Sequence, residues 1–396
     1  MANQVANEHD LYIERGGPFY RLMQRIGLIQ GEGPSLIRRI VIFVILIWVP
    51  LLAFAFWEGV AIGPTPASSM LYDFATMARI ALGVPLLIAA EVAIGPRVRT
   101  AGLQFLRAEL VRPRDYPRFE AAIARLARWR EANWVEVGLF LLAVIGGWTI
   151  SAESVYGSLQ STWHDVTVQT EGIKRLSYTG LWYHMVAVPI IQFFMARWFW
   201  RYLIWIRFLY DVSKLDLDLG PTHADGAAGL AFLGTAQLSF GILAFALAVV
   251  LSAAAAFRLV FQDVAIQEFS VHFFSVIITA ELFLLGPLIM FSPAMARVRL
   301  EWLRTYSTLV LEYNRAFHQK WVVGPRPSEP MLGSADFQSL ADLGNGYEYV
   351  RSMKIVPFSV RIIVQMALLI IVPAMPLLVL VMPLNQILDL VSKAVL

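Results

Sequence analysis

The stretch IVIFVILIWVPLLAFAFWEGV, residues Ile40–Val60, decides the class of fold, because its 21 residues contain a single charged side chain, Glu58. A helix needs about 20 apolar residues to cross the hydrocarbon core of a bilayer. This stretch is long enough, and a polar arm over residues 1–36 precedes it. We therefore expect a retained transmembrane helix here and not a cleaved signal peptide.

Six further stretches meet the same requirement. They are Phe74–Ile94, Val135–Ser151, Gly180–Ile206, Gly229–Phe257, Phe273–Met295 and Phe358–Met382. The second of these is short, and Pro373 and Pro376 interrupt the last, so six or eight spans remain open. Only 15% of the 396 residues are charged and 58% are hydrophobic, whereas soluble domains carry about 25% charged residues. The sequence predicts an all-α integral membrane protein with about seven transmembrane helices.

Lysine and arginine are concentrated in alternate predicted loops. Of the 32 basic residues, 27 lie before the first span or in Pro96–Asn133, Arg197–Gly226 and Arg297–Arg361. Cytoplasmic loops of membrane proteins carry such an excess, so the pattern predicts a cytoplasmic N-terminus and an outer C-terminus. The alternation holds across all seven predicted spans, which supports their number.

The same pattern divides the chain into four parts. Residues 1–36 form a cytoplasmic arm, in which Phe19, Leu22, Met23 and Ile26 share one face of an expected interfacial helix. A bundle of six spans with arginine-rich cytoplasmic loops follows over 37–293. Residues 294–357 are expected to form a cytoplasmic helical region. The seventh span and a tail occupy 358–396.

Ionisable and amide side chains within predicted spans are candidates for an ion or solute pathway, because burying them in a bilayer is costly. They are Arg79, Glu91, His184, Gln192 and Glu281. Each has a structural alternative as a member of a buried pair, or as a hydrogen-bonded neutral group. Glu281 lies near mid-depth of its span, and we expect it to face protein or water and not lipid.

A second group follows the fourth span, within RWFWRYLIWIRFLYDVSKLDLDLGPTHADGAAGLAFLG, residues Arg197–Gly234. Arg197, Trp198, Arg201 and Arg207 are typical of an aromatic and basic collar that anchors a helix at the headgroups. The sharper hypothesis is a site for anionic lipid, because Arg197 and Arg201 share a helix face.

The acidic residues further on allow two interpretations. His223 and Asp225 lie in a turn where Thr222 is placed as an N-cap and Asp225 as its capping-box partner. The Asp225-Gly226-Ala227-Ala228 run also resembles the opening of the metal-binding motif of membrane phosphatidyltransferases. The arginine of that motif is missing, and the next acid, Asp263, lies across a whole span. Capping is therefore the favoured interpretation.

Other classes of function lack their signatures. The chain has no GxSxG, HExxH, GxxxxGK[ST] or GxGxxG motif and no cysteine, and its six histidines are scattered. The arginines follow membrane topology and form no patch typical of nucleic-acid binding. We expect no enzyme activity, no cofactor, no metal site and no nucleic-acid partner.

The Arg197–Gly234 run and the later GSADFQSLADLGNGYEYVRSMKIVPFS, residues 333–359, resemble a group of bacterial multi-pass inner-membrane proteins. The resemblance extends over most of the chain and implies location and topology, with no activity attached. The arrangement of seven spans with a large loop before the last is also similar to the topology of insect chemoreceptor channels.

These observations lead to one functional hypothesis and one alternative. The hypothesis is a homo-oligomeric channel or solute pathway of the bacterial inner membrane, with oligomer or partner contacts through its cytoplasmic segments. The alternative is a non-conducting membrane sensor or scaffold that binds anionic lipid or a protein partner. Within Gly333–Ser352, Ser334 is expected to cap a helix that Gly344-Asn345-Gly346 ends. We expect this segment to dock beside the Pro221–Gly226 turn.

Overall fold

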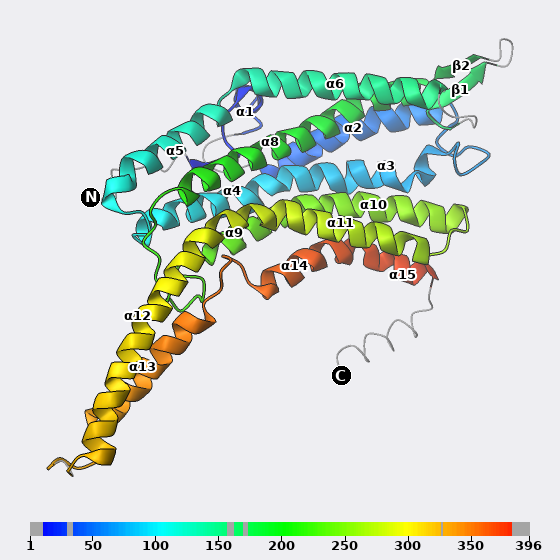
Figure 1. Cartoon of the computed structure of the whole chain (residues 1–396). Helices are drawn as coiled ribbons and strands as arrows, with labels where there is room; N and C mark the ends of the chain where they lie inside the picture. The colour runs from blue at the N-terminus through cyan, green and yellow to red at the C-terminus, as the bar shows by residue number, and fades with distance from the viewer. Residues whose placement is uncertain (1–10, 30–34, 157–161, 169–172, 326–327, 382–396) are drawn as a thin grey trace.

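The computed structural model describes residues 11–29, 35–156, 162–168, 173–325 and 328–381. In the described chain, long helices lie side by side in one bundle, and a pair of helices projects from one end of it (Figure 1). Their bounds are α1 Pro18–Arg25, α2 Leu36–Trp57, α3 Phe74–Ala78, α4 Val84–Arg107, α5 Tyr116–Arg130, α6 Asn133–Tyr156, α7 Tyr178–Trp182, α8 Val188–Ser213, α9 Phe232–Ser239, α10 Gly241–Phe261, α11 Gln267–Leu285, α12 Ser292–His318, α13 Ala335–Ser352, α14 Val360–Ile371 and α15 Met375–Val381. A short antiparallel hairpin of β1 (Asp165–Val168) and β2 (Ile173–Leu176) lies at the opposite end.

The protein is an all-α multi-pass membrane protein, as the sequence predicts. Among the described residues, six helices are long and apolar enough to cross a membrane. They span Leu36–Trp57, Phe74–Arg107, Tyr178–Ser213, Phe232–Phe261, Gln267–Val323 and Val360–Leu380. A bent pair, Pro113–Arg130 with Asn133–Thr149, raises the number to seven if it is counted as one span. The last span is broken by a turn of 3-10 helix, Val372–Ala374, at the predicted proline, and residues beyond 381 lie outside the described chain.

Prolines set the irregular turns inside the long helices. A π-helical turn, Arg79–Gly83, joins α3 to α4 just before Pro85, and a second, Tyr183–Ala187, joins α7 to α8 just before Pro189. Proline has no N–H to donate, so each of these positions lacks one hydrogen bond of the regular helix. Likewise, the 3-10 helix Gly286–Phe291 contains Pro287 and joins α11 to α12. Each break therefore has a local cause in the sequence.

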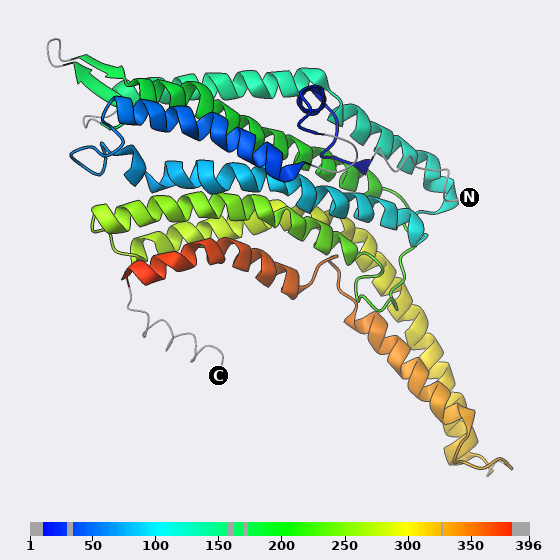
Figure 2. The same ribbon diagram turned by 180° about the vertical axis from the view of Figure 1, so that it is seen from behind.

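The end of the bundle that carries α1, α5 and the projecting helices is called here the arginine-rich end (Figure 1). Figure 2 shows α1 from behind, beside α6. Phe19 packs on Phe43, Phe193 and Phe194, and Met23 is buried, whereas Leu22 and Ile26 are about half exposed. The predicted apolar face of this helix is thus divided between the bundle and the surface.

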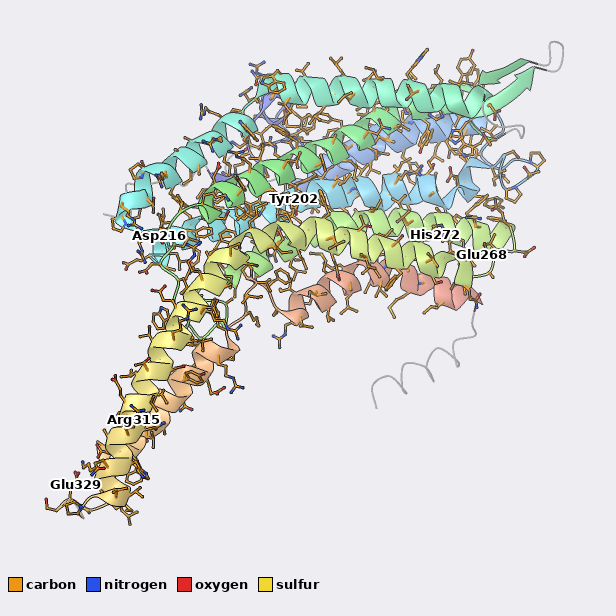
Figure 3. All side chains as sticks on the ribbon, in the orientation of Figure 1. Tyr202, Asp216, Glu268, His272, Arg315 and Glu329 are labelled. Atoms are coloured by element: carbon orange, nitrogen blue, oxygen red, sulfur yellow. The ribbon has the colours of Figure 1, made fainter. Side chains whose placement is uncertain are left out.

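The projecting pair, called here the α12–α13 arm, is the main difference from the predicted layout (Figure 3). Ser334 caps α13 as predicted, because its Oγ accepts from the N–H of Asp336 at 3.3 Å. The docking of this part beside the bundle, however, is wrong. Phe337 packs on the ring of Phe317 at 4.9 Å, and the indole Nε1 of Trp321 donates to Asp336 at 2.9 Å, so α13 lies along α12.

The predicted end of α13 at Gly344-Asn345-Gly346 is also wrong, since the helix continues to Ser352. Contact with α12 overrides the local preference: a Cβ at Gly346 would lie only 3.2 Å from the Tyr306 ring, so glycine permits close packing there. Just after α13, the chain reaches the Pro221–Gly226 turn, where the N–H of Lys354 donates to the Gly226 carbonyl at 2.9 Å.

That turn is organised by Asp225 and not by the predicted Thr222 cap. The Asp225 carboxylate accepts from the N–H groups of Ala227 at 2.8 Å, Gly229 at 3.1 Å and Ala231 at 3.0 Å. Burial raises the pKa of Asp225, but these three hydrogen bonds outweigh it and lower the pKa overall. The turn therefore depends on the ionised carboxylate.

We predict that Asp225→Ala lowers the free energy of unfolding in detergent by about 2–4 kcal/mol, because it leaves three backbone donors without their charged acceptor. Asp225→Asn should lower the free energy of unfolding by an intermediate amount. In the wild type, the stability that the ionised carboxylate contributes is lost as pH falls through the lowered pKa of Asp225. The control is Asp218→Ala, which removes an exposed pair with Arg112 at 3.2 Å and costs at most about 1 kcal/mol. Equal melting temperatures for Asp225→Ala and Asp218→Ala would contradict this role.

Candidate functional site

A network of buried ion pairs lies at the arginine-rich end of the bundle. Arg197 of α8 donates from Nη1 to Glu91 of α4 at 3.1 Å and from Nε to Glu136 of α6 at 3.0 Å. The other Glu91 oxygen accepts from Arg39 of α2, and Glu136 also accepts from Nη2 of Arg201 at 3.0 Å. All five side chains are at most 8% exposed. The network therefore joins four helices through charged groups removed from solvent.

The N-terminal segment, Leu11–Ile29, completes this network from one side. Arg201 donates from Nη2 to the Gly16 carbonyl at 2.8 Å, and the Phe19 N–H donates to Glu136 at 2.9 Å. Gly16 and Gly17 have φ angles of +94° and +87°, a region that favours glycine. These two glycines let the chain turn its carbonyls and N–H groups toward the ion network.

Glu14 is the one carboxylate that this segment inserts into the bundle. It is 8% exposed, and it lies so close to Gly95 of α4 that a Cβ there would be 2.2 Å from its Cδ atom. Its Oε2 has no hydrogen-bond partner among the described residues, and neither do Nε and Nη1 of Arg201. Burial, aided by the Glu91 charge and opposed by Arg15 and Arg201, raises the pKa of Glu14 to about 7.

This burial contradicts the predicted lipid collar. Arg197, Trp198 and Arg201 are 1–4% exposed, and the indole of Trp198 donates to the Leu87 carbonyl at 2.8 Å inside the bundle. None of the three can therefore reach a lipid headgroup in this fold. Arg207 alone of the predicted group is exposed, and it pairs with Asp211 at 3.1 Å.

The predicted pathway residues fall into separate places. Glu91 belongs to the ion network, and Gln192 lies against Gly146, where a Cβ would be 2.5 Å from its Oε1. Arg79 and His184 lie near one another toward the β-hairpin end, each in a π-helical turn. Glu281 lies apart from them on α11. The bundle of one chain therefore brings no more than two of these five residues together.

The Arg79 and His184 neighbourhood is held by aromatic contacts. Arg79 donates to the Tyr183 hydroxyl at 2.8 Å, and the His184 ring lies 5.0 Å from the His164 ring, centre to centre. His184 is buried and its ring nitrogens have no partner among the described residues. Burial, with the neighbouring His184, lowers the pKa of His164 to about 3, so the ring is neutral at ordinary pH.

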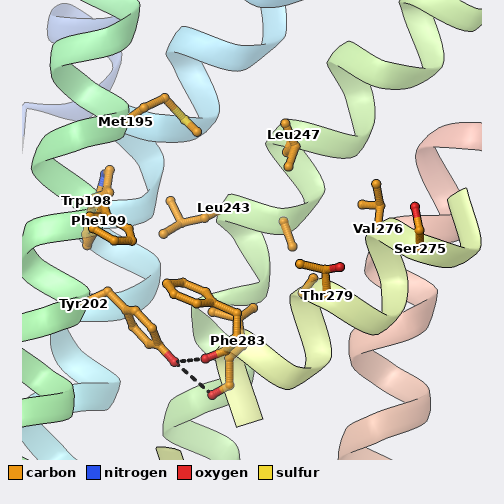
Figure 4. Close-up of a pocket in the computed structure, with 13 residues that line it drawn as sticks. Met195, Trp198, Phe199, Tyr202, Leu243, Leu247, Ser275, Val276, Thr279 and Phe283 are labelled. Carbon is orange, nitrogen blue, oxygen red and sulfur yellow. Dashed lines mark hydrogen bonds between the residues drawn. The ribbon is translucent and has the colours of Figure 1, made fainter. Parts of the chain in front are cut away.

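An apolar cavity of about 340 Å³ lies between α8, α10 and α11 (Figure 4). Trp198, Phe199 and Tyr202 line it from α8, Leu243 and Leu247 from α10, and Thr279 and Phe283 from α11. Sequence reasoning missed this cavity, because its residues are ordinary members of apolar spans. The cavity forms only where α8, α10 and α11 come together in the fold.

The floor of the cavity is fixed by a polar network that follows from Pro287. Since proline has no N–H, the Phe283 carbonyl four residues earlier loses its helical donor. The Tyr202 hydroxyl takes the place of that donor. It lies 2.7 Å from the Phe283 carbonyl oxygen and 3.1 Å from the Leu284 carbonyl oxygen, to which it donates. Gln237 of α9 donates to the Tyr202 hydroxyl at 2.8 Å and accepts from Trp205 at 3.1 Å. The cavity therefore lies directly beside the joint between α11 and the α12–α13 arm.

We predict that Glu14→Gln removes a pH dependence from folding stability. The folded protein holds the Glu14 proton more tightly than the unfolded chain, so deprotonation destabilises the fold as pH rises from 4.5 to about 7. The glutamine variant should gain about 3 kcal/mol relative to wild type across this range. The measurement is chemical unfolding in detergent at several pH values, with exposed Glu120→Gln as control. A constant difference between variant and wild type at all pH values would contradict the prediction.

Metal-binding geometry and comparison with known proteins give no function for the residues of the ion network and the cavity. No group of three or more His, Cys, Asp or Glu side chains suited to a metal ion occurs in the described chain. No protein-family model matches the sequence, and no curated protein or solved structure matches it. The chemistry of the ion network, the cavity and Glu281 is what remains to indicate a function.

Proposed function

We propose that the protein is an oligomeric channel or solute pathway of the bacterial inner membrane, in which copies of the chain meet along α11. The observation that carries this proposal is Glu281. It lies within a membrane-crossing candidate, it is partly exposed in the single chain, and it has no hydrogen bond or ion pair with any described residue. Exposing a carboxylate to hydrocarbon costs at least a few kcal/mol. A second copy, with water between the two, would relieve that cost.

The placement of the other charges supports a pathway between copies. Arg39, Arg197 and Arg201 pair with Glu91 and Glu136 inside the bundle, where these side chains join helices. Removing one member of such a network is strongly destabilising, so these residues are poorly suited to exchange partners with a passing ion. Glu281, which has no such partner, is the better candidate for contact with a solute.

The α12–α13 arm supports contact between copies. Leu300, Leu309 and Leu311 of α12 and Phe337 of α13 are 40–56% exposed. The arm follows α11 through the 3-10 helix Gly286–Phe291 (Figure 3), so one neighbouring copy can contact both the arm and α11. We also propose that the arginine-rich end faces the cytoplasm, because it gathers most of the basic residues.

The alternative is a membrane sensor that does not conduct. The cavity beside the α11–α12 joint favours it, because an occupant there would contact the residues that hold the arm in place. In this version the arm would engage a protein partner, and the exposed Arg207 would contact anionic lipid.

We predict that Glu281→Gln lowers cation flux through liposomes about tenfold, because it removes the carboxylate that lies deepest within the membrane-crossing part of α11. Glu268→Gln, at the exposed start of the same helix, should leave flux nearly unchanged. The measurements are ion-selective flux and the subunit number by native mass spectrometry. A purified protein that is monomeric at all concentrations and passes none of several ions would overturn the proposal and leave the sensor.

A further inference from the structure

The cavity between α8, α10 and α11 is shaped for an apolar chain that lies parallel to the helices. Its α8 wall runs from Met195 to Tyr202, and its α11 wall runs from Ser275 to Phe283. At a rise of 1.5 Å per residue, each wall is about 10–12 Å long. A volume of about 340 Å³ falls within the range of small-ligand sites.

The lining excludes a charged or strongly polar occupant. No charged side chain lines the cavity. The Tyr202 hydroxyl donates to carbonyls of α11, and the Ser275 hydroxyl donates to the His272 backbone carbonyl at 2.8 Å within its own helix. Thr279 is left as the single lining hydroxyl without a hydrogen bond to a described residue. An occupant therefore gains almost entirely by burying apolar surface.

The surroundings identify the source of that occupant. All three walls belong to helices that can cross a membrane. The rim carries Phe199, Leu247 and Phe283, which are 51%, 43% and 42% exposed, so the opening continues into the apolar outer surface of the bundle. The medium beside such an opening is lipid hydrocarbon.

We propose that this cavity binds one acyl chain of a membrane phospholipid, which enters sideways from the bilayer and packs on Tyr202 and Phe283. Its headgroup stays outside the cavity. Because Tyr202 and Gln237 hold the Phe283 and Leu284 carbonyls at the end of α11, the bound chain supports the joint from which the α12–α13 arm projects. This proposal stands whether or not the protein conducts ions.

The test uses the full-length protein in vesicles of phosphatidylethanolamine and phosphatidylglycerol that contain a phospholipid with a diazirine in mid-chain. After photolysis, mass spectrometry locates the crosslinked peptides. We expect crosslinks to concentrate on Met195–Tyr202 and Ser275–Phe283, and excess unlabelled phospholipid to compete for them. Crosslinks spread over the exposed faces of α2 and α6 as densely as over these two segments would overturn the proposal. Competition by a soluble apolar compound and not by phospholipid would overturn it too.

Two variants fill the cavity from different sides. Ala280→Phe from α11 or Ala244→Leu from α10 should lower crosslinking at Met195–Tyr202 about tenfold. The control, Ile278→Phe, places the same phenyl ring on a face of α11 that does not line the cavity. Hydrogen exchange over Gly286–Phe291 should quicken in the filled variants if a chain supports the joint. If a variant with a filled cavity folds and its crosslinking at Met195–Tyr202 is unchanged, the proposal is contradicted. If neither variant folds, the distribution of crosslinks on the wild-type protein decides between the outcomes.

Discussion

The contact of Arg197 with both Glu91 and Glu136 is the interaction on which the rest of the structure depends. It fixes α8 against α4 and α6 at once, and Arg39 and Arg201 extend it to α2 and to the N-terminal segment. Buried charges are costly unless each has a partner, so the helices can pack in few other rotations about their axes. The network therefore contributes to specificity of packing, which apolar spans of similar composition cannot supply by themselves.

Much of the architecture could be predicted because its causes are local. The lengths of the apolar runs give the spans, and Ser334 caps α13 because a cap depends on neighbouring residues. The ion network could not be predicted, although Glu91 and Arg197 both attract notice in the sequence. They are 106 residues apart, and their pairing depends on how two helices are rotated toward each other. Glu136 lies at the start of a predicted span and Glu14 lies in the predicted polar arm, and in both places a charge is ordinary and gives no signal.

The errors have a common physical origin. Gly344-Asn345-Gly346 would end an isolated helix. Here α13 continues through these residues, because the Tyr306 ring of α12 packs closely on the backbone at Gly346, where there is no side chain. The predicted collar fails for a similar reason: arginine and tryptophan near a span end suit the headgroups, yet here Trp198 finds its acceptor at Leu87. In both cases a partner distant in sequence outweighs a local preference.

The docking of the N-terminal segment has a consequence for how the protein is made. Glu14 and Gly16 are joined to arginines that follow 183 and 185 residues later. At the ribosome's rate of about 5–20 residues per second, the segment waits on the order of 10–40 s before α8 exists. The segment is therefore synthesised early and yet is among the last parts of the chain to reach its place. A fused N-terminal tag, or a chaperone that held this segment, would act on membrane assembly before it acted on the finished molecule.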